Sequence, residues 1–206
     1  MEIVKVEEVG VDAAAARAAD VIAKGGIVAY PTDTLYGLGV NALDEAAVKR
    51  LKELKGRDEG KPISIMVPNV DAISWHAELT PAARVLAEKF LPGPLTLVVP
   101  AKEHLPQELT SSGTIGIRIP DDAFSRAFSA MSEHPITSTS ANLAGMETPH
   151  TVKDLLAHFG PKMMLIDLYV DDGPRSGGVG STVVSCLTNL PVVLREGAIS
   201  KKDLGL

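Results

Sequence analysis

The chain has 206 residues, which is enough for one well-buried core, and its 45% hydrophobic and 22% charged content is that of an ordinary globular protein. Its formal net charge of -6 argues against a protein whose main role is to grip nucleic acid, because such proteins usually carry a basic surplus. No stretch approaches the ~20 apolar residues of a membrane span, the acidic N-terminus is unlike a signal peptide, and the single cysteine, Cys186, cannot form an internal disulfide. We therefore expect a soluble, cytoplasmic protein with no membrane partner, in which Cys186 is a buried structural thiol.

The first third of the chain alternates strand and helix signals. Apolar and charged residues alternate near the N-terminus, as in a half-buried strand, and an alanine-rich segment follows. Further on, Val48, Leu51 and Leu54 form one apolar stripe of a helix. The elements expected here are a strand over residues 3–9, a helix over 13–24 capped by Asp12, a strand over 27–30, a helix over 45–55 capped by Asp44, and a strand over 63–67.

The rest of the chain continues this alternation. Thr80 and Pro81 suit a helix start, and Thr151 with Asp154 resembles a capping box. The elements expected here are helices over 81–90, from Asp121 or Asp122 to 131, and from Thr151 to 159, and strands over 95–99, 115–119, 164–170, 183–186 and 192–194, with one more strand beginning at Ile136. Because strands and helices alternate without a break in composition, we expect one α/β domain over residues 1–206, with a mixed sheet.

The segment PTDTLYGLG, residues 31–39, directly follows the apolar strand expected over 27–30. Pro31 has no N–H to donate and ends that strand, and the residues after it supply hydroxyls, a carboxylate and two glycines. A strand that opens into such residues is typical of a small-molecule site. A Pro/Gly-rich turn with a threonine cap explains the same residues, so this stretch alone leaves both interpretations open.

Several common catalytic motifs are absent from the sequence. The five histidines form no HExxH motif and share no helical face, and there is no cysteine cluster, so we expect no metal site. No G-x-S-x-G elbow occurs. The glycine-rich loop over residues 173–182 lacks the lysine of a P-loop, which excludes a Walker nucleotide site.

Cations and hydroxyls at loop positions remain as candidates. Residues 49–61 carry six bases and three acids, a local charge of +3, and either phosphate binding by Lys55 and Arg57 or a solvated basic turn explains them. Arg118 lies on the opposite strand face from the neighbouring isoleucines, where it fits a solvated face or a concave anion-binding one. The segment STSAN, residues 138–142, and Arg195 also end apolar strands.

A characteristic series of segments follows in order along the chain. The segments are PTDTLYGLG (31–39), KGR (55–57), PGPLTLVVP (92–100), IGIRIP (115–120), STSAN (138–142), GVGST (178–182) and LREGAI (194–199). This series resembles the YrdC-like family, the threonylcarbamoyl-AMP synthases, over about residues 22–199. The resemblance implies a single-domain YrdC-like fold, in which helices flank a twisted mixed sheet with a basic concave cavity.

The resemblance also implies a nucleotidyltransferase reaction. L-threonine, bicarbonate and ATP would yield threonylcarbamoyl-AMP and pyrophosphate, the first step of tRNA N6-threonylcarbamoyladenosine formation. A downstream threonylcarbamoyl transferase complex would modify the tRNA, to which this chain itself would bind weakly. Mg²⁺ would be carried by the ATP phosphates. This chemistry needs positioning and cations rather than a protein nucleophile.

Roles for individual residues follow from the resemblance alone. The residues that would be catalytic are Lys55, Arg57, Ser140 and Asn142. Those that would hold L-threonine are Thr32, Arg118, Ser138 and Ser181, with Arg118 on the carboxylate. Those that would hold ATP are Lys55, Arg57, Lys61, Thr114, Ser140, Thr148 and Arg195.

The chain departs from some relatives in two ways. Where they carry histidine in the strand after the basic loop, the nearest residue here is Met66, so the resemblance does not extend to a threonine contact from that strand. The chain also resembles the short form without a C-terminal extension.

Two alternative functions remain. One is an RNA-binding module of the same fold, against which the acidic charge and scarce aromatics argue. The other is a carbamoyl transferase that acts on another acceptor, which is the activity of YrdC-like domains in hydrogenase-maturation proteins.

Overall fold

The computed structural model of the chain describes residues 1–56, 62–110, 113–175 and 178–206. Ten strands in these ranges form one sheet. From one edge to the other they are β1 (Glu2–Lys5), β8 (Leu168–Asp171), β2 (Val28–Tyr30), β3 (Gly37–Gly39), β7 (Ile136–Ser140), β4 (Ser64–Met66), β6 (Thr114–Arg118), β5 (Leu95–Pro100), β9 (Thr182–Ser185) and β10 (Val192–Arg195). Parallel pairs such as β4–β6 occur beside antiparallel pairs such as β5–β6, so the prediction of a mixed sheet is confirmed.

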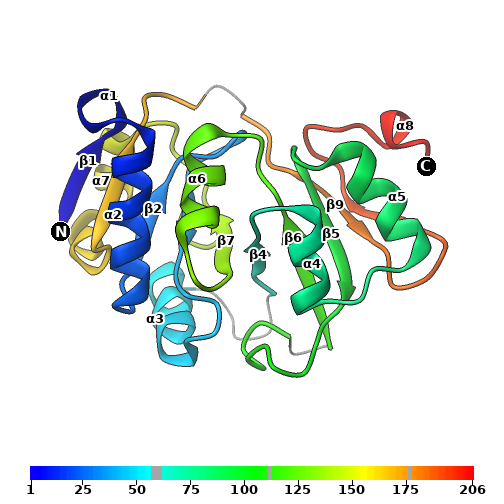
Figure 1. Ribbon diagram of the computed structural model, residues 1–206. Coiled ribbons are helices and arrows are strands. Elements are labelled where there is room, and N and C mark those ends of the chain that lie inside the picture. Colours follow the sequence, from blue (N-terminus) through cyan, green and yellow to red (C-terminus); the bar gives the residue numbers. More distant parts are fainter. Residues whose placement is uncertain (57–61, 111–112, 176–177) are drawn as a thin grey trace.

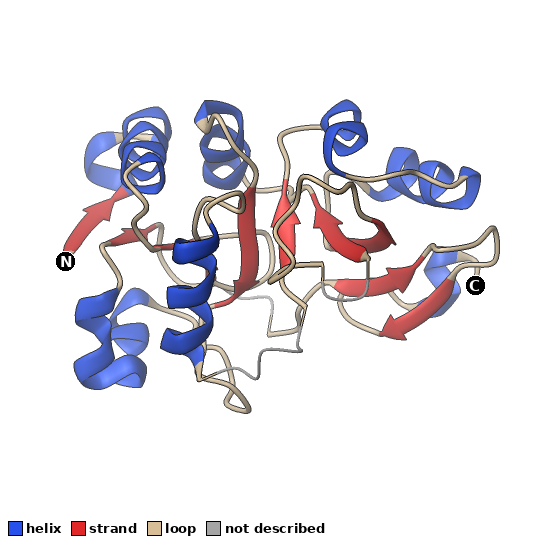
Figure 2. Ribbon diagram, turned by 90° about the horizontal axis from the view of Figure 1, so that it is seen from below, coloured by secondary structure: helices blue, strands red, loops and turns tan. Residues whose placement is uncertain are grey.

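Helices lie on both sides of the sheet (Figure 2). They are α1 (Val6–Val9), α2 (Val11–Ala23), α3 (Glu45–Lys55), α4 (Val70–His76), α5 (Pro81–Phe90), α6 (Ala123–Met131), α7 (Val152–Phe159) and α8 (Lys201–Leu204), with the 3-10 helix η1 (Gly160–Leu165). Helices α2 and α6 pack side by side, with α6 nearer the middle of the molecule, and α5 lies toward the end opposite α2 (Figure 1). In the described ranges no helix is long and apolar enough to cross a membrane.

Two clusters of buried hydrophobic side chains hold these layers together. The smaller cluster includes Tyr30 and Phe128, whose rings meet edge to face with centroids 5.5 Å apart. The larger cluster includes Leu51 of α3 and Ile117 of β6. Cys186 belongs to this larger cluster and is fully buried, and burial raises its pKa to about 11. The prediction of a buried structural thiol is therefore confirmed.

Capping side chains define the helix starts that the sequence predicts. The side chains of Asp44, Thr80, Asp122 and Thr151 each accept a hydrogen bond from the backbone N–H three residues on, at the starts of α3, α5, α6 and α7. Such a bond satisfies one of the N–H groups that a helix start leaves unpaired. These four predicted boundaries are confirmed.

Three other predicted elements differ from the structure. The N-terminal strand is wrong beyond Lys5, because residues 6–9 form α1, in which two valines three positions apart share a face and two glutamates occupy the first turn. Helix α2 is capped by Gly10, and Asp12 lies within its first turn instead of capping it. The strand expected over 164–170 is shorter, because η1 occupies its first positions.

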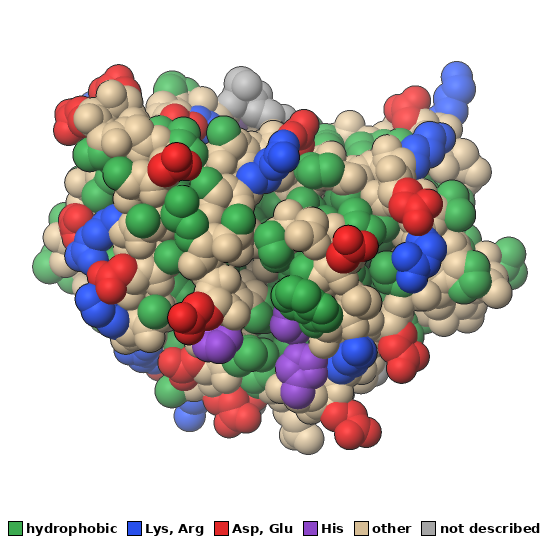
Figure 3. All heavy atoms as spheres, viewed as in Figure 1, with side chains coloured by type: hydrophobic (Ala, Val, Ile, Leu, Met, Phe, Trp, Pro, Cys, Tyr) green, Lys and Arg blue, Asp and Glu red, His purple; other side chains and the backbone are tan. Residues whose placement is uncertain are grey.

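Charged side chains of both signs are interspersed over the face of the molecule shown in Figure 3. Among the described residues on this face, acidic and basic groups alternate over the helices without forming a patch of one sign. A nucleic-acid-binding surface usually gathers lysine and arginine on one face. This face therefore offers no basic platform for RNA.

Candidate active site

A cavity of about 1020 Å³ lies against one face of the sheet. Thr96 of β5 and Arg118 of β6 line it, whereas their neighbours Leu97 and Ile117 are buried in the larger core cluster. Because side chains alternate across a strand, the cavity and this core lie on opposite faces of β5 and β6. The predicted placement of Arg118 opposite the isoleucines is confirmed, and since Arg118 is only 8% exposed, its face is a concave wall rather than open surface.

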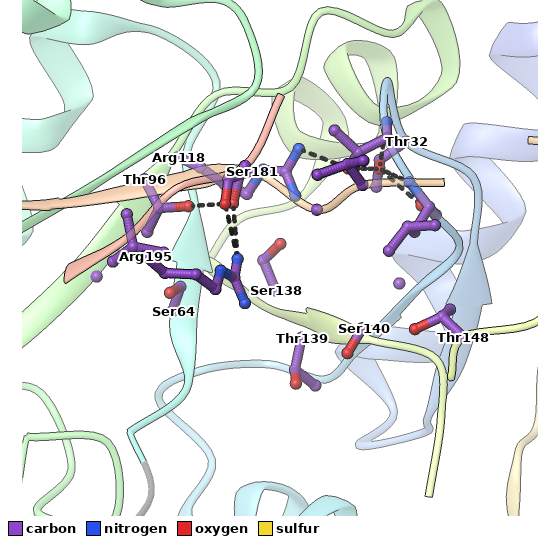
Figure 4. Close-up of a pocket in the computed structure, with 18 of the residues that line it drawn as sticks. Thr32, Ser64, Thr96, Arg118, Ser138, Thr139, Ser140, Thr148, Ser181 and Arg195 are labelled. Carbon is purple, nitrogen blue, oxygen red and sulfur yellow. Dashed lines mark hydrogen bonds between the residues drawn. The ribbon is translucent and has the colours of Figure 1, made fainter. Parts of the chain in front are cut away.

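Most of the predicted binding residues line this cavity (Figure 4). They are Thr32, Thr114, Arg118, Ser138, Ser140, Thr148, Ser181 and Arg195. These residues come from the loop after β2, from β6, β7 and β10, and from the loops before α7 and β9, so distant segments form one site. Lys55 and Asn142 do not line the cavity but contact Ser140, which does. Arg57 and Lys61 lie outside the described residues.

The Thr32 hydroxyl shapes the loop between β2 and β3. Its oxygen accepts hydrogen bonds from the backbone N–H groups of Thr34 at 3.2 Å and Leu35 at 3.3 Å, and it donates to the Leu35 carbonyl at 2.7 Å. At the end of the segment, a Cβ on Gly39 would stand 2.6 Å from Ile136, so only glycine lets β3 fit here between its neighbours. The threonine-capped turn, one of the two interpretations that the sequence leaves open, is present, and residues of the same turn line the cavity.

A buried ion pair holds Arg118 at one side of the cavity. Its Nη2 lies 2.5 Å from Oδ1 of Asp33 and 3.4 Å from the hydroxyl oxygen of Thr34. Oδ2 of Asp33 accepts a hydrogen bond from the backbone N–H of Asp121 at 3.2 Å. Desolvation raises the pKa of Asp33, and the positive charge of Arg118 opposes that rise. The Nε of Arg118 is buried and has no hydrogen-bond partner among the described residues.

Near Arg118, Ser181 contacts Thr96 and Arg195 (Figure 4). The hydroxyl oxygens of Ser181 and Thr96 are 2.8 Å apart, and Nη2 of Arg195 donates to the Ser181 carbonyl at 2.8 Å. Desolvation lowers the pKa of Arg195, and the positive charge of Arg118 lowers it further. The two guanidinium groups therefore repel each other, and an anion bound between them would relieve that repulsion.

Lys55 ends α3 against the turn that follows β7. Its Nζ donates to the Ser140 carbonyl, and it lies 2.9 Å from the carbonyl oxygen and 3.3 Å from Oδ1 of Asn142. The Ser140 hydroxyl in turn donates to Oδ1 of Asn142 at 2.5 Å. The structure thus brings together the described members of the predicted catalytic group, with the Lys55 ammonium directed at this turn. A contact between Lys55 and phosphate stays a prediction.

Ser64 and Thr96 are among the polar residues near the cavity to which the sequence assigns no role. Thr96 is the one polar residue in the apolar run over 95–99, which is the same signal that singles out Arg118. Ser64 lines the cavity beside β6, where a Cβ on Gly116 would stand 2.4 Å from its hydroxyl oxygen. The sequence notes Asp33 only as the carboxylate of the segment 31–39, and its pairing with Arg118 is not predicted, because that partner lies on a distant strand.

Acidic side chains also reach the cavity. Glu147 and Glu196 line it, together with His150. Among the residues that the structure describes, no group of three or more His, Cys, Asp or Glu side chains could hold a metal ion. The expected basic character of the cavity stays a prediction, because two of the cations assigned to it, Arg57 and Lys61, are outside the described residues.

Comparisons with known proteins agree with one another. A family model described as Telomere recombination, for the Sua5/yciO/yrdC domain, matches residues 20–197. The threonylcarbamoyl-AMP synthase of Pyrococcus abyssi is 38% identical over 189 residues, which is 91% of this chain and 55% of that protein. A putative threonylcarbamoyl-AMP synthase of Methanocaldococcus jannaschii is 37% identical over 183 residues, which is 89% of this chain and 85% of that protein. The chain therefore spans about half the length of the first relative and most of the second.

A solved structure matches the fold as well. The crystal structure of P. abyssi Sua5 complexed with L-threonine superposes with a TM-score of 0.85 at 37% identity. The match covers 96% of this chain and 58% of that one. The sheet described above, with its flanking helices, is thus shared with P. abyssi Sua5, whose structure contains L-threonine.

Proposed function

Because the chain belongs to the Sua5/YciO/YrdC family, we propose that it is a threonylcarbamoyl-AMP synthase, which converts L-threonine, bicarbonate and ATP into threonylcarbamoyl-AMP and pyrophosphate. One observation carries the proposal: Arg118 and Arg195 line a single cavity, with hydroxyl-bearing side chains between them (Figure 4). Two guanidinium groups in one cavity suit a ligand set that contains both a carboxylate and phosphates.

The proposed reaction forms two bonds. The threonine amine attacks the carbon of bicarbonate, so that a C–N bond forms, water leaves and a carbamate results. A carboxylate oxygen of this carbamate then attacks the α-phosphorus of ATP, and the bond to the pyrophosphate leaving group breaks. Neither step requires a protein nucleophile. Both require aligned reactants and positive charge near the developing negative charge.

We place L-threonine beside Arg118, whose guanidinium lines the cavity and can donate to the substrate carboxylate. The hydroxyls proposed to bind the rest of the amino acid are those of Thr32, Ser138 and Ser181. L-threonine bound in the P. abyssi Sua5 structure supports a threonine site on this fold.

ATP would occupy the remainder of the cavity. The residues proposed to hold it are Lys55, Arg57, Lys61, Thr114, Ser140, Thr148 and Arg195. Lys55 can serve in one of two ways. Its ammonium can leave the turn at Ser140 and Asn142 to meet a phosphate, or it can hold that turn so that the Ser140 hydroxyl faces the nucleotide.

Magnesium fits this proposal as an ion brought in by ATP. Mg²⁺ is commonly held by one or two carboxylates together with substrate phosphates. Glu147 and Glu196 line the cavity and are the carboxylates that could hold it there. When bound, the ion would neutralise charge on the phosphates. The orientation of the substrates would depend on the protein residues named above.

The proposed product defines the partner. Threonylcarbamoyl-AMP is a mixed anhydride that water can destroy, so a second enzyme must consume it. We propose that a threonylcarbamoyl transferase complex does so in the cytoplasm and transfers the group to a tRNA adenosine. The net charge of -6 opposes tight binding of tRNA, so we expect direct binding of tRNA by this chain to be weak.

Release of pyrophosphate from ATP and bicarbonate, with and without L-threonine, tests the proposal. The expected result is threonine-dependent release that Lys55→Ala and Arg118→Ala lose. Lys24→Ala, at an exposed lysine paired with Asp20, is the control and should retain it. Turnover with carbamoyl phosphate instead would favour the carbamoyl transferase alternative. Salt-sensitive RNA binding without turnover would favour the binding module.

A further inference from the structure

We infer that Asp33 is a positioning residue for the amino-acid substrate: it aims the Arg118 guanidinium at the substrate carboxylate without touching the substrate itself. The inference rests on the proposed function of the cavity. Arg118 lines the cavity, whereas Asp33 does not and stands behind it.

Asp33 is clamped from two directions. One carboxylate oxygen lies 2.5 Å from Nη2 of Arg118, and the other accepts the backbone N–H of Asp121, which follows β6. Both oxygens are therefore engaged, and the side chains of Asp33 and Arg118 are each 9% exposed. A carboxylate fixed at both oxygens and shielded from water holds its partner in one orientation.

The ion pair leaves part of the guanidinium unused. Asp33 and Thr34 both contact Nη2 of Arg118. The Nε is buried without a hydrogen-bond partner among the described residues. Asp33 thus holds Arg118 through Nη2, while the Arg118 side chain still lines the cavity in which the substrate carboxylate would bind.

The Asp33–Arg118 ion pair also explains how the Arg118 guanidinium can remain charged in the cavity wall when no substrate is bound. A buried arginine with no counter-charge would carry a large desolvation cost, and Asp33 offsets it. Arg195, the other guanidinium of the cavity, repels Arg118, so the negative charge behind Arg118 keeps it in place between substrates. The role of Asp33 is therefore to hold and orient the Arg118 guanidinium, which is the group that contacts the substrate.

Asp33→Asn tests the inference, because it removes the charge while keeping the shape of the side chain. We expect the dissociation constant of L-threonine, measured by calorimetry, and the KM for threonine to rise about tenfold. The kcat at saturating threonine and the KM for ATP should stay within about twofold of wild type, since the interaction lost is one of substrate binding. Asp33→Glu restores the negative charge on a longer side chain. Its affinity for L-threonine should lie between those of wild type and Asp33→Asn, about threefold weaker than wild type.

A matched control and a double variant separate positioning from general damage. Asp167→Asn alters a carboxylate that accepts the backbone N–H of Ile27 away from the cavity, and it should leave threonine binding unchanged. In an Arg118→Ala background, Asp33→Asn should weaken threonine binding no further, because its effect passes through Arg118.

The outcomes distinguish this inference from the proposed function. A wild-type protein that neither binds threonine nor releases pyrophosphate would overturn the function. An active wild type with unchanged threonine affinity in Asp33→Asn, or an additive loss in the double variant, would overturn the role of Asp33 alone. Should Asp33→Asn not fold, Asp33→Glu decides: wild-type threonine affinity overturns the role, and weakened affinity with an unchanged KM for ATP supports it.

Discussion

The hydroxyl oxygens of Thr96 and Ser181 lie 2.8 Å apart, although the residues are 85 positions apart in the chain. The parallel pairing of β5 with β9 sets this distance, because Thr96 is in register with Val183, two residues after Ser181. Both hydroxyl-bearing residues are buried at the cavity wall. The contact therefore ties the serine proposed to bind threonine to a neighbouring strand.

Thr96→Val should weaken threonine binding without preventing folding. Valine keeps the shape of threonine but removes the partner of the Ser181 hydroxyl, a loss of about 1 kcal/mol. Because Ser181 is then free to turn, we expect the KM for threonine to rise about fivefold with kcat nearly unchanged. Steady-state pyrophosphate release measures both quantities.

Thr110→Val is the control for that variant. It removes a hydroxyl that donates to the Pro106 carbonyl outside the cavity, so it should leave the KM for threonine unchanged. An equal rise in KM in both variants would show that the effect of Thr96→Val is not local to Ser181.

Gly116→Ala should reduce activity by crowding the cavity. The added Cβ would stand 2.4 Å from Oγ of Ser64 and 3.3 Å from Cγ2 of Thr96, both of which line the cavity. The side chains of Ser64 and Thr96 must move, which changes the shape of the cavity in which ATP and threonine would bind. We expect a loss of pyrophosphate release of about tenfold or more, which is the effect of losing about 1.4 kcal/mol of transition-state binding.

The double variant Gly116→Ala with Ser64→Ala tests the cause of that loss. Removing the Ser64 hydroxyl takes away the closest collision, so the double variant should recover part of the activity that Gly116→Ala loses. If the two losses simply add, the collision with Ser64 is not the reason for the defect.

The sequence predicts local features of this fold better than its long-range pairs. Caps such as Asp44 act within three residues, so the start of α3 is readable from the sequence. By contrast, α4 spans seven residues, too few for a clear helical period, although Asn69 caps it. The partner of Asp33 lies 85 positions away on β6, and no local pattern indicates that pairing. Such contacts depend on strand order, which the sequence alone leaves open.

His76 should make the stability of the protein fall at acid pH. Histidines gather beside α4 on the face in Figure 3, and Nδ1 of His76 lies 3.0 Å from Nε2 of His104. Desolvation lowers the pKa of His76 from 6.5 to about 4, with smaller effects from the charges of His104 and Lys102. Because the folded state resists protonation, this group's contribution to stability is fully present above pH 6.5 and is lost as the pH falls toward 4.

Thermal melting of His76→Gln against pH checks this expectation. As the pH falls from 6.5 to 4, the Tm of the variant should decrease less than the Tm of wild type, because glutamine does not titrate. His134→Gln, at an exposed histidine, is the control and should follow the wild-type curve. Parallel curves for wild type and His76→Gln would contradict the assignment.

Lys55→Met should both destabilise the protein and reduce its activity. Methionine fills similar space but removes the ammonium that donates to the carbonyls of Ser140 and Asn142. Leaving these acceptors unpaired costs about 1–3 kcal/mol, and for a chain of this size each kcal/mol lowers the Tm by about 2–4 °C. Calorimetric melting measures the stability, and pyrophosphate release measures the activity.

Comparison with Asn142→Ala separates the two roles open to Lys55. If the ammonium acts by holding the turn, both variants loosen the same turn, and the double variant should be no less active than Lys55→Met alone. If the ammonium meets a phosphate during the reaction, Lys55→Met should lose far more kcat than Asn142→Ala, even at saturating ATP. A Lys55→Met protein that melts and turns over like wild type would contradict both roles, because the ammonium would then support neither the turn nor the phosphates.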